Sequence, residues 1–280
     1  MTFSARPRKR FGQHWLKSER ILSQIVAAAN LQEGDRVLEI GPGTGILTQR
    51  LLPLAEHVTA IEVDRDLCQR LRQQFAATPN FQLIEGDILA AGWDRLLALA
   101  PAQPFPHKVV ANIPYYITGP ILERLLGTLS APNPDPFESI VLLVQREIAD
   151  RLCAAPGTKT VSGLTIRVQY LATCDLICEV PSQAFQPPPK VDSAVIRLQP
   201  RPFERLAQDP AWLERLLKVG FASKRKMLRN NLSTLVERSQ VLDTFQQLSI
   251  PHKARAEDLG VTDWVALSNK MLEKGDTPST

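Results

Sequence analysis

The sequence contains no apolar run that approaches the roughly 18 residues needed to cross a lipid bilayer. Its amino terminus is basic, but no apolar segment follows the charges, so a secretory signal is not indicated. Hydrophobic residues make up 44% of the 280 residues and charged residues 22%. We therefore expect a soluble globular protein without a membrane partner, large enough for one main core and a small second domain.

Cysteine and histidine are scarce, with four residues of each. Of the cysteines, only Cys174 and Cys178 are close in sequence, and neither a second pair nor a group of histidines accompanies them. This spacing argues against zinc, so we expect no metal. Unpaired cysteines fit a reducing compartment, and the predicted location is the cytoplasm. Neither an internal repeat nor an oligomer seam is recognisable, which favours a monomer.

The charge of the chain is unevenly distributed. Residues 1–20 carry a net charge of +5, residues 21–200 carry −4, and residues 201–280 carry +3. A mildly acidic body between basic ends suggests a polyanionic partner that is bound by the periphery. Basic tails are also common as simply solvated segments, so this pattern alone leaves both interpretations open.

Short apolar runs alternate with amphipathic stretches between residues 36 and 145. This alternation predicts an α/β fold with a mostly parallel sheet and a ligand site at the carboxyl ends of the strands. The expected strands are 36–40, 58–62, 81–84, 108–111 and 139–144, with two more at 174–180 and 193–198. Beyond Pro200-Arg201-Pro202 the pattern changes to helices only, which are expected to begin near Asp209-Pro210 and to run through Leu228. The predicted division is a basic arm at 1–20, an α/β domain at 21–203 and a helical domain at 204–280.

A glycine-rich loop follows the first predicted strand, with Glu39 before the sequence Gly-Pro-Gly-Thr-Gly of residues 41–45. Glycines allow the backbone to approach a ligand closely. Glu62 ends the second strand and can accept hydrogen bonds from ribose hydroxyls, and Asp87 follows the third strand, where it can accept from an adenine amino group. The spacing is Gly-x-Gly-x-Gly and not the Gly-x-Gly-x-x-Gly of a dinucleotide site.

The acid ahead of the glycines also bears on the ligand. Glu39 would repel a pyrophosphate but would favour a cationic sulfonium, so the pattern favours S-adenosylmethionine over a dinucleotide. For Glu39 itself, capping of the glycine loop is as good an interpretation as direct contact with a ligand.

The fourth predicted strand ends in Asn112-Ile113-Pro114-Tyr115-Tyr116. An Asn amide can accept from an exocyclic amino group and donate to a ring nitrogen, as it does when it pairs with adenine. Pro114 keeps the loop extended and stiff, and the tyrosines offer ring faces for stacking. Taken alone, the segment is equally typical of an ordinary strand exit with a tyrosine packed in the core.

These motifs together resemble the class I S-adenosylmethionine-dependent methyltransferases that modify adenine N6. Three further segments are similar to motifs of the ribosomal RNA adenine dimethyltransferase family, namely FGQHWL at 11–16, FQPPPKVDS at 185–193 and KRKMLRNNL at 224–232. The resemblance covers residues 10 to 270. It implies a Rossmann-like, mostly parallel sheet with helices on both faces and a small all-helical carboxy-terminal domain.

The resemblance also implies an activity and its residues. The expected reaction dimethylates N6 of two adjacent adenosines in a hairpin near the 3′ end of small-subunit (16S) ribosomal RNA, in the immature 30S subunit. The implied cofactor contacts are His14, Leu16, Gly41, Gly43, Glu62, Asp87 and Asn112. The residues implied at the target base are Asn112, Ile113, Pro114, Tyr115 and Phe185. The implied RNA contacts are Arg8, Lys9, Arg10, Lys190, Lys224, Arg225, Lys226 and Arg229.

Within that pattern, Asn112 and the Ile113 carbonyl would hold the amino group, Tyr115 would stack on the base, and Phe185 would close its other face. Bland alternatives remain: Phe185 could be a core anchor, and His14 could be an ordinary hydrogen-bonded residue. The family usually has Phe where this chain has Trp15, and Tyr116 has no assigned role. Two other functions remain open, a resistance methyltransferase acting on large-subunit RNA and a non-catalytic assembly factor.

Overall fold

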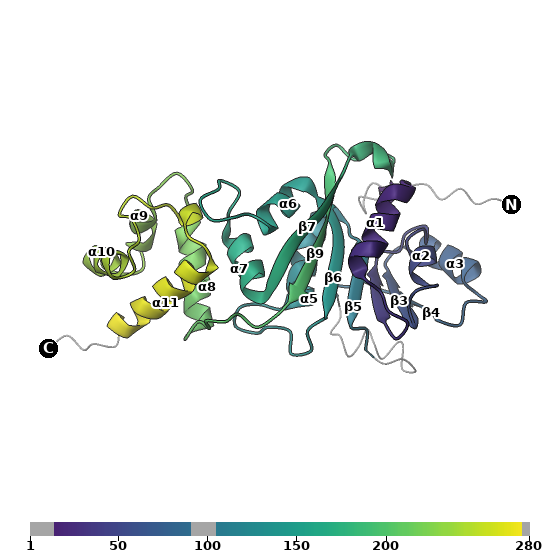
Figure 1. Cartoon of the computed structure of the whole chain (residues 1–280), viewed down its shortest axis with the longest axis horizontal. Helices are drawn as coiled ribbons and strands as arrows, with labels where there is room; N and C mark the ends of the chain where they lie inside the picture. Colours follow the sequence, from purple (N-terminus) through teal and green to yellow (C-terminus); the bar gives the residue numbers. More distant parts are fainter. Residues whose placement is uncertain (1–13, 91–104, 276–280) are drawn as a thin grey trace. The chain divides into compact units, whose positions relative to one another are not determined.

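The structure is a computed structural model that describes residues 14–90 and 105–275 (Figure 1). The chain forms two compact units. The first unit spans residues 1–125, 135–149 and 174–200, and the second spans 126–134, 150–173 and 201–280. No helix in these described parts is both long and apolar enough to cross a membrane.

A seven-stranded sheet with the order β4-β3-β2-β5-β6-β9-β7 forms the centre of the first unit (Figure 1). Strands β2 to β6 run parallel to one another, and β9 is antiparallel to β6. The bounds are β2 (Arg36–Ile40), β3 (His57–Glu62), β4 (Phe81–Glu85), β5 (Lys108–Asn112), β6 (Ser139–Gln145), β7 (Ala172–Val180) and β9 (Ser193–Pro200). Every strand expected from the sequence is found within two residues of its predicted bounds. The mostly parallel α/β sheet is therefore confirmed.

Both faces of this sheet are covered, because consecutive residues of its strands are buried. All six residues of β3 are buried, as are five in succession in β6. Continuous apolar runs of this kind are the signature of a parallel sheet enclosed on two sides. Helix α1 (Glu19–Ala29) packs on β5, β6 and β9, and α3 (Arg65–Gln74) packs on β3 and β4. The remaining helices that begin among the described residues of this unit are α2 (Thr48–Leu51), η2 (Tyr115–Ile117), α5 (Thr118–Leu126), α6 (Arg146–Leu152) and η3 (Ser182–Ala184).

A second, two-stranded sheet joins the start of the described chain to the proline-rich loop. Strand β1 (Trp15–Leu16) pairs antiparallel with β8 (Phe185–Gln186), which places Trp15 opposite Gln186 and Leu16 opposite Phe185. Leu16 and Phe185 are buried in the same apolar cluster as α1. Residues 15–16, at the end of the FGQHWL segment, and residues 185–186, at the start of the proline-rich segment, are therefore neighbours in space.

The second unit has a helical core. Its helices are α7 (Gly163–Leu171), α8 (Pro210–Gly220), α9 (Leu228–Leu232), α10 (Arg238–Gln247), η4 (Ala256–Asp258) and α11 (Val261–Gly275). Leu213, Leu217, Phe245 and Trp264 are buried within this core. The helical carboxy-terminal region predicted from the sequence is thus present.

The helical region predicted to begin near Asp209-Pro210 is present. Its start is right, because the Asp209 side chain accepts hydrogen bonds from the backbone amides of Ala211 and Trp212. Within this region α8 ends at Gly220, whose carbonyl accepts a 2.7 Å hydrogen bond from the Asn231 side chain. A side chain from the next helix thus satisfies a terminal carbonyl that a longer helix would have used itself.

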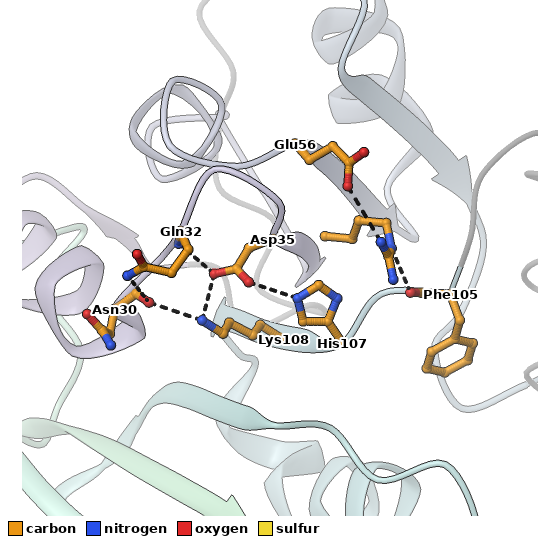
Figure 2. Close-up of polar contacts among 8 residues, drawn as sticks. Asn30, Gln32, Asp35, Glu56, Phe105, His107 and Lys108 are labelled. Carbon is orange, nitrogen blue, oxygen red and sulfur yellow. Dashed lines mark hydrogen bonds and ion pairs between the residues drawn. The ribbon is translucent and has the colours of Figure 1, made fainter.

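A buried ionic cluster anchors the amino ends of β2 and β5 (Figure 2). Asp35 accepts hydrogen bonds from Lys108 Nζ at 2.6 Å and from the Gln32 amide at 2.7 Å, and its other oxygen lies 2.8 Å from His107 Nε2. Burial opposes ionisation of Asp35, but these hydrogen bonds, that from Lys108 first, hold its pKa below the ordinary value. A carboxylate oxygen of Glu138 also lies within 4.8 Å of the Asp35 carboxylate and of the His107 ring nitrogen. Since Lys108 already balances the Asp35 charge, the group serves as a structural anchor.

Candidate active site

A hollow of about 750 Å³, open solvent included, lies at the carboxyl ends of β2, β3 and β5. Its lining comes from four stretches of the first unit, namely 14–16, 39–47, Glu62 and 112–115, with Leu22 and Leu67 behind them. The structure thus brings together most of the predicted cofactor residues, which are His14, Leu16, Gly41, Gly43, Glu62 and Asn112. A ligand site at this edge of a parallel sheet is the position expected from topology.

The glycine loop is held in shape by its own amides. Gly41 and Gly43 have φ angles of +67° and +60°, a region that strains other residues. The Gly41 amide donates to the Ile61 carbonyl at 2.9 Å, the Gly43 amide to Glu62 Oε2 at 3.2 Å, and the Gly45 amide to the Pro42 carbonyl at 2.9 Å. These three donors are therefore committed to the protein. A phosphate-binding loop instead directs such amides at its ligand.

Glu62 is buried at the end of β3 and is hydrogen-bonded by three amides. Its Oε1 accepts from Val63 at 3.0 Å and from Asp64 at 2.9 Å, whereas Oε2 accepts only from Gly43 among the described residues. Burial raises the pKa of Glu62, and these hydrogen bonds oppose the rise. Each carboxylate oxygen has two acceptor positions, so Oε2 retains one for a ligand hydroxyl.

Glu39 is only 1% exposed and lies on the lining of the same hollow. Its Oε2 accepts a 2.7 Å hydrogen bond from the hydroxyl of Thr48, the first residue of α2. Burial raises the pKa of Glu39 to about 8, and the negative charge of Glu62 adds to this rise. The hydrogen bond from Thr48 acts in the opposite direction but does not cancel it. Both sequence interpretations have support here, because the side chain secures the loop and also faces the ligand space. Sequence reasoning missed Thr48, whose position at a helix start was the available signal.

The asparagine loop is braced at several points. Asn112 Nδ2 makes a long, 3.4 Å hydrogen bond to the His14 carbonyl. The His14 ring donates through Nδ1 to the Pro187 carbonyl at 2.8 Å and stacks on Tyr115, with ring centroids 6.2 Å apart. His14 is therefore a connector between β1, the proline-rich loop and the asparagine loop.

The two tyrosines have different surroundings. The Tyr115 hydroxyl lies 2.5 Å from that of Ser193, a fully buried residue that begins β9. Burial raises the pKa of Tyr115, and the Ser193 hydrogen bond opposes this, so the phenol stays neutral. Tyr116, in contrast, is 61% exposed. Ser193 was part of a recognised motif, but its role as the partner of Tyr115 was not visible in the sequence.

Two predicted site residues are absent from the lining of the hollow. Asp87 is exposed, and its Oδ1 accepts from the Leu89 amide at 2.9 Å. Phe185 is only 1% exposed and packs in the core opposite Leu16. Phe185 thus lies as a loop anchor in this structure, and its predicted role at the target base stays a prediction.

The predicted RNA contacts are spread over both units. Lys190 is exposed on the proline-rich loop of the first unit. Lys224, Arg225 and Lys226 are exposed in the turn that precedes α9, and half-buried Arg229 lies on that helix. The three turn residues therefore do not share a helix face. Arg8, Lys9 and Arg10 lie outside the described residues.

Comparison with known proteins assigns the family. The family model for ribosomal RNA adenine dimethylase matches residues 4–273. This chain belongs to that family. It is also similar to ribosomal RNA small subunit methyltransferase A of Nostoc punctiforme, at 57% identity over 272 residues and 95% of each chain. The corresponding protein of Acaryochloris marina is 56% identical over 95% of this chain and 97% of its own.

Solved structures confirm the predicted fold class. A dimethyladenosine transferase from Plasmodium falciparum has a TM-score of 0.77 and 30% identity, over 94% of this chain and 98% of its own. The 23S rRNA methyltransferase ErmE has a TM-score of 0.70 and 25% identity, over 92% and 99%. This member of the dimethylase family is accordingly a methyltransferase that acts on ribosomal RNA and uses S-adenosylmethionine.

The hollow fits that cofactor better than it fits a dinucleotide. Glu39 can ionise beside a positive sulfur or an ammonium group, and Glu62 can accept from ribose hydroxyls, whereas negative charge on either carboxyl group would oppose a pyrophosphate. The glycine amides are turned inward, so they offer little to phosphate. A Cβ on Gly43 would lie 3.5 Å from the Trp15 ring and would occupy space at this wall. Glu62, the glycine loop and the β1 segment line the hollow in which S-adenosylmethionine is expected.

Proposed function

We propose that this chain dimethylates N6 of two adjacent adenosines in a hairpin near the 3′ end of 16S ribosomal RNA, within the immature 30S subunit. The observation that carries the proposal is the 57% identity to a small-subunit methyltransferase over 95% of both chains. Identity to ErmE, which acts on 23S rRNA, is 25%. The large-subunit alternative is therefore the weaker one.

The proposed chemistry relies on positioning. When bound, S-adenosylmethionine supplies a methyl group from its positively charged sulfur. The Asn112 side chain and the Ile113 carbonyl would accept from the amino group of adenine and fix its nitrogen at the hollow. An amino group becomes acidic as it gains a fourth substituent, so no strong base is needed beforehand. Holding two reactants in line can lower a barrier by about 7–11 kcal/mol.

Tyr115 is the proposed stacking platform for the target base. Its ring lines the hollow and is held by the Ser193 hydroxyl and by the His14 ring. A base stacked on an aromatic ring contributes about 1–3 kcal/mol, which helps to offset the cost of taking the base out of its own stack. Closure of the other face by Phe185 would require this buried ring to become exposed.

Contact with the RNA is proposed for exposed basic residues of both units. Lys190 lies on the proline-rich loop, which His14 connects to the asparagine loop. Lys224, Arg225 and Lys226 are exposed on one turn of the second unit. Such residues bind phosphates and provide affinity, whereas recognition of the shape of the RNA provides specificity. The division into an arm at 1–20 and domains at 21–203 and 204–280, a monomeric state and a cytoplasmic location remain part of this proposal.

The test is methylation of 30S subunits and, separately, of 50S subunits, each lacking the modification, with the 16S and 23S RNAs then mapped by primer extension. We expect two adjacent stops near the 3′ end of the small-subunit RNA, with tritiated methyl incorporated to about four groups per subunit, because each adenosine accepts two. Stops in the 23S RNA would support the large-subunit alternative. Tight binding to subunits without methyl transfer would instead support a non-catalytic assembly factor.

A further inference from the structure

Tyr116 presents an aromatic ring to solvent directly beside the candidate active site. It is 61% exposed, while its neighbour Tyr115 lines the hollow. Both residues belong to η2, a single turn of 3₁₀ helix that starts where the asparagine loop ends. Successive side chains in such a helix are about 120° apart, so the two rings leave the backbone in different directions.

The exposed position of Tyr116 is built into the turn. The Ile117 amide donates to the Pro114 carbonyl at 3.3 Å, and the Thr118 hydroxyl donates to the Tyr115 carbonyl at 3.1 Å. Tyr115 is fixed from the other side by Ser193. Because these hydrogen bonds hold the residues on both sides of Tyr116, the backbone cannot rotate to bury the Tyr116 ring without also moving Tyr115. An exposed ring on a fixed turn loses little freedom when it binds a flat partner.

We propose that Tyr116 is a nucleotide-binding residue that stacks on the base adjoining the target adenosine. This inference rests on the proposed function, because it requires a substrate with two neighbouring bases at the site. Once one base has left its stack to enter the hollow, the neighbouring base loses a stacking partner on that side. Tyr116 supplies a replacement face next to Tyr115, and Lys190 offers a charge for the phosphate backbone on a loop that is tied to the same site through His14 and Pro187.

The neighbouring base is a better occupant than a second protein. A single exposed ring is too small an apolar area for a protein interface, and isolated surface aromatics are ordinary. Base stacking, in contrast, needs only one ring face and tolerates any base. Tyr116 follows Asn112, the residue proposed to hold the target amino group, by four positions on the same loop, and this placement favours a nucleotide.

The experiment is a double-mutant cycle that combines substitution of Tyr116 with removal of the neighbouring base. 30S subunits are reconstituted with small-subunit RNA that carries either adenosine or an abasic nucleotide next to one target adenosine. The kcat/KM for methylation of that target is then measured for the wild-type protein, Tyr116→Ala and Tyr116→Phe. We expect the abasic RNA to lower the wild-type value about tenfold, within the range for one base–aromatic stack.

For Tyr116→Ala, we expect about the same tenfold loss on intact RNA, mostly in KM, and almost no further loss on abasic RNA. Tyr116→Phe keeps the ring and should restore most of what Tyr116→Ala loses. Leu206→Ala is the matched control, because Leu206 is 64% exposed but lies in the second unit. S-adenosylhomocysteine binding, followed by calorimetry, should not differ among the variants.

Three results would overturn the inference: wild-type kinetics for Tyr116→Ala, losses that multiply between Tyr116→Ala and the abasic RNA, or a Tyr116→Phe variant as impaired as Tyr116→Ala. Failure of the wild-type protein to methylate the small-subunit RNA would be a different result, because it would refute the proposed function. An altered affinity of Tyr116→Ala for S-adenosylhomocysteine would also count against the inference, since the stack does not involve the cofactor.

Discussion

The carboxyl group of Glu39 accepts a 2.7 Å hydrogen bond from the Thr48 hydroxyl while almost wholly buried beside the ligand space. This pairing secures the glycine loop between β2 and α2. It also keeps an ionisable group where a positively charged ligand is expected. Because burial raises the pKa of Glu39 to about 8, the group is mostly protonated at pH 7.

We predict that S-adenosylmethionine binding at pH 7 releases about one proton, because a nearby cation lowers the pKa of an acid. Calorimetry in phosphate and in Tris at the same pH would measure it, since the buffer takes up the released proton and adds its own heat of protonation, which differs between the two buffers. Glu39→Gln should remove the difference between buffers while keeping the hydrogen bond to Thr48. Equal heats for the wild-type protein in both buffers would refute the prediction.

The same raised pKa of Glu39 affects folding. In the folded state, the proton is retained between the ordinary pKa of 4.5 and about 8, whereas in the unfolded chain it is lost across that window. The free energy of unfolding contributed by this group should therefore fall as the pH rises from 5 to 8. Glu39→Gln should flatten that slope in urea titrations. An unchanged slope would show that Glu39 ionises as readily in the folded protein as in the unfolded chain.

The Tyr115–Ser193 hydrogen bond should be worth a measurable part of the folding stability. Ser193→Ala leaves the half-buried Tyr115 hydroxyl without its partner, so the free energy of unfolding should fall by about 1–3 kcal/mol. Tyr115→Phe combined with Ser193→Ala should recover part of that loss, since neither polar group then remains unpaired. Urea denaturation of the four proteins in the cycle tests this. Additive losses would mean that the two hydroxyls do not interact.

Asn112→Ala is expected to lower the single-turnover methylation rate about 100-fold, similar to the loss of one positioned polar group in other active sites. The affinity for S-adenosylhomocysteine should change much less, because among the described residues the Asn112 side chain makes one hydrogen bond, a long 3.4 Å contact with the His14 carbonyl that supports little of the pocket. Calorimetry provides that comparison. A near-normal rate would remove Asn112 from the proposed chemistry.

Lys108→Met should destabilise the protein by about 3–5 kcal/mol, because it leaves the buried Asp35 without its main partner. Asp35→Asn together with Lys108→Met should be milder. Since the folded pKa of Asp35 is lowered, its contribution is present above the ordinary value of 3.8 and is lost as the pH falls through the folded pKa. Lys108→Met should therefore unfold at a higher pH than the wild-type protein in an acid titration. An unchanged acid midpoint would contradict the role of Lys108.

Replacement of Lys224, Arg225 and Lys226 by Ala should weaken subunit binding and reduce the slope of log affinity against log salt by about 2 to 3. Binding is measured by filtration at several salt concentrations. Arg65→Ala with Arg72→Ala is the control, because both arginines pair with Glu85 on the first unit. An unaltered slope in the triple variant would mean that the turn does not contact phosphate.

The central strands β2, β3, β5 and β6 were predictable from the sequence because each is a mostly apolar, mostly buried run. In a parallel sheet covered on both faces, almost every strand residue is buried, as in β3, and such runs leave little doubt about their ends. The strand ends also predicted that Gly41, Glu62 and Asn112 would meet. At these positions, the local sequence pattern and the arrangement of the strands in the sheet lead to the same prediction.

What the sequence could not provide are relationships between distant side chains. The end of α8 at Gly220 depends on an amide of Asn231, and the placement of Tyr115 depends on Ser193, 78 residues away. The buried position of Phe185 likewise follows from the pairing of β1 with β8. Tertiary contacts of this kind override local periodicity, and only the folded arrangement makes them visible.

The pairing of β1 with β8 has a consequence for the order in which ligands bind. Trp15 and Leu16 line the hollow, and their strand partners Gln186 and Phe185 begin the proline-rich loop that carries Lys190. A ligand that stabilises either strand therefore stabilises both. Binding of S-adenosylmethionine in the hollow should therefore raise the affinity of the protein for RNA. By thermodynamic linkage, RNA should raise the affinity for S-adenosylmethionine by the same factor.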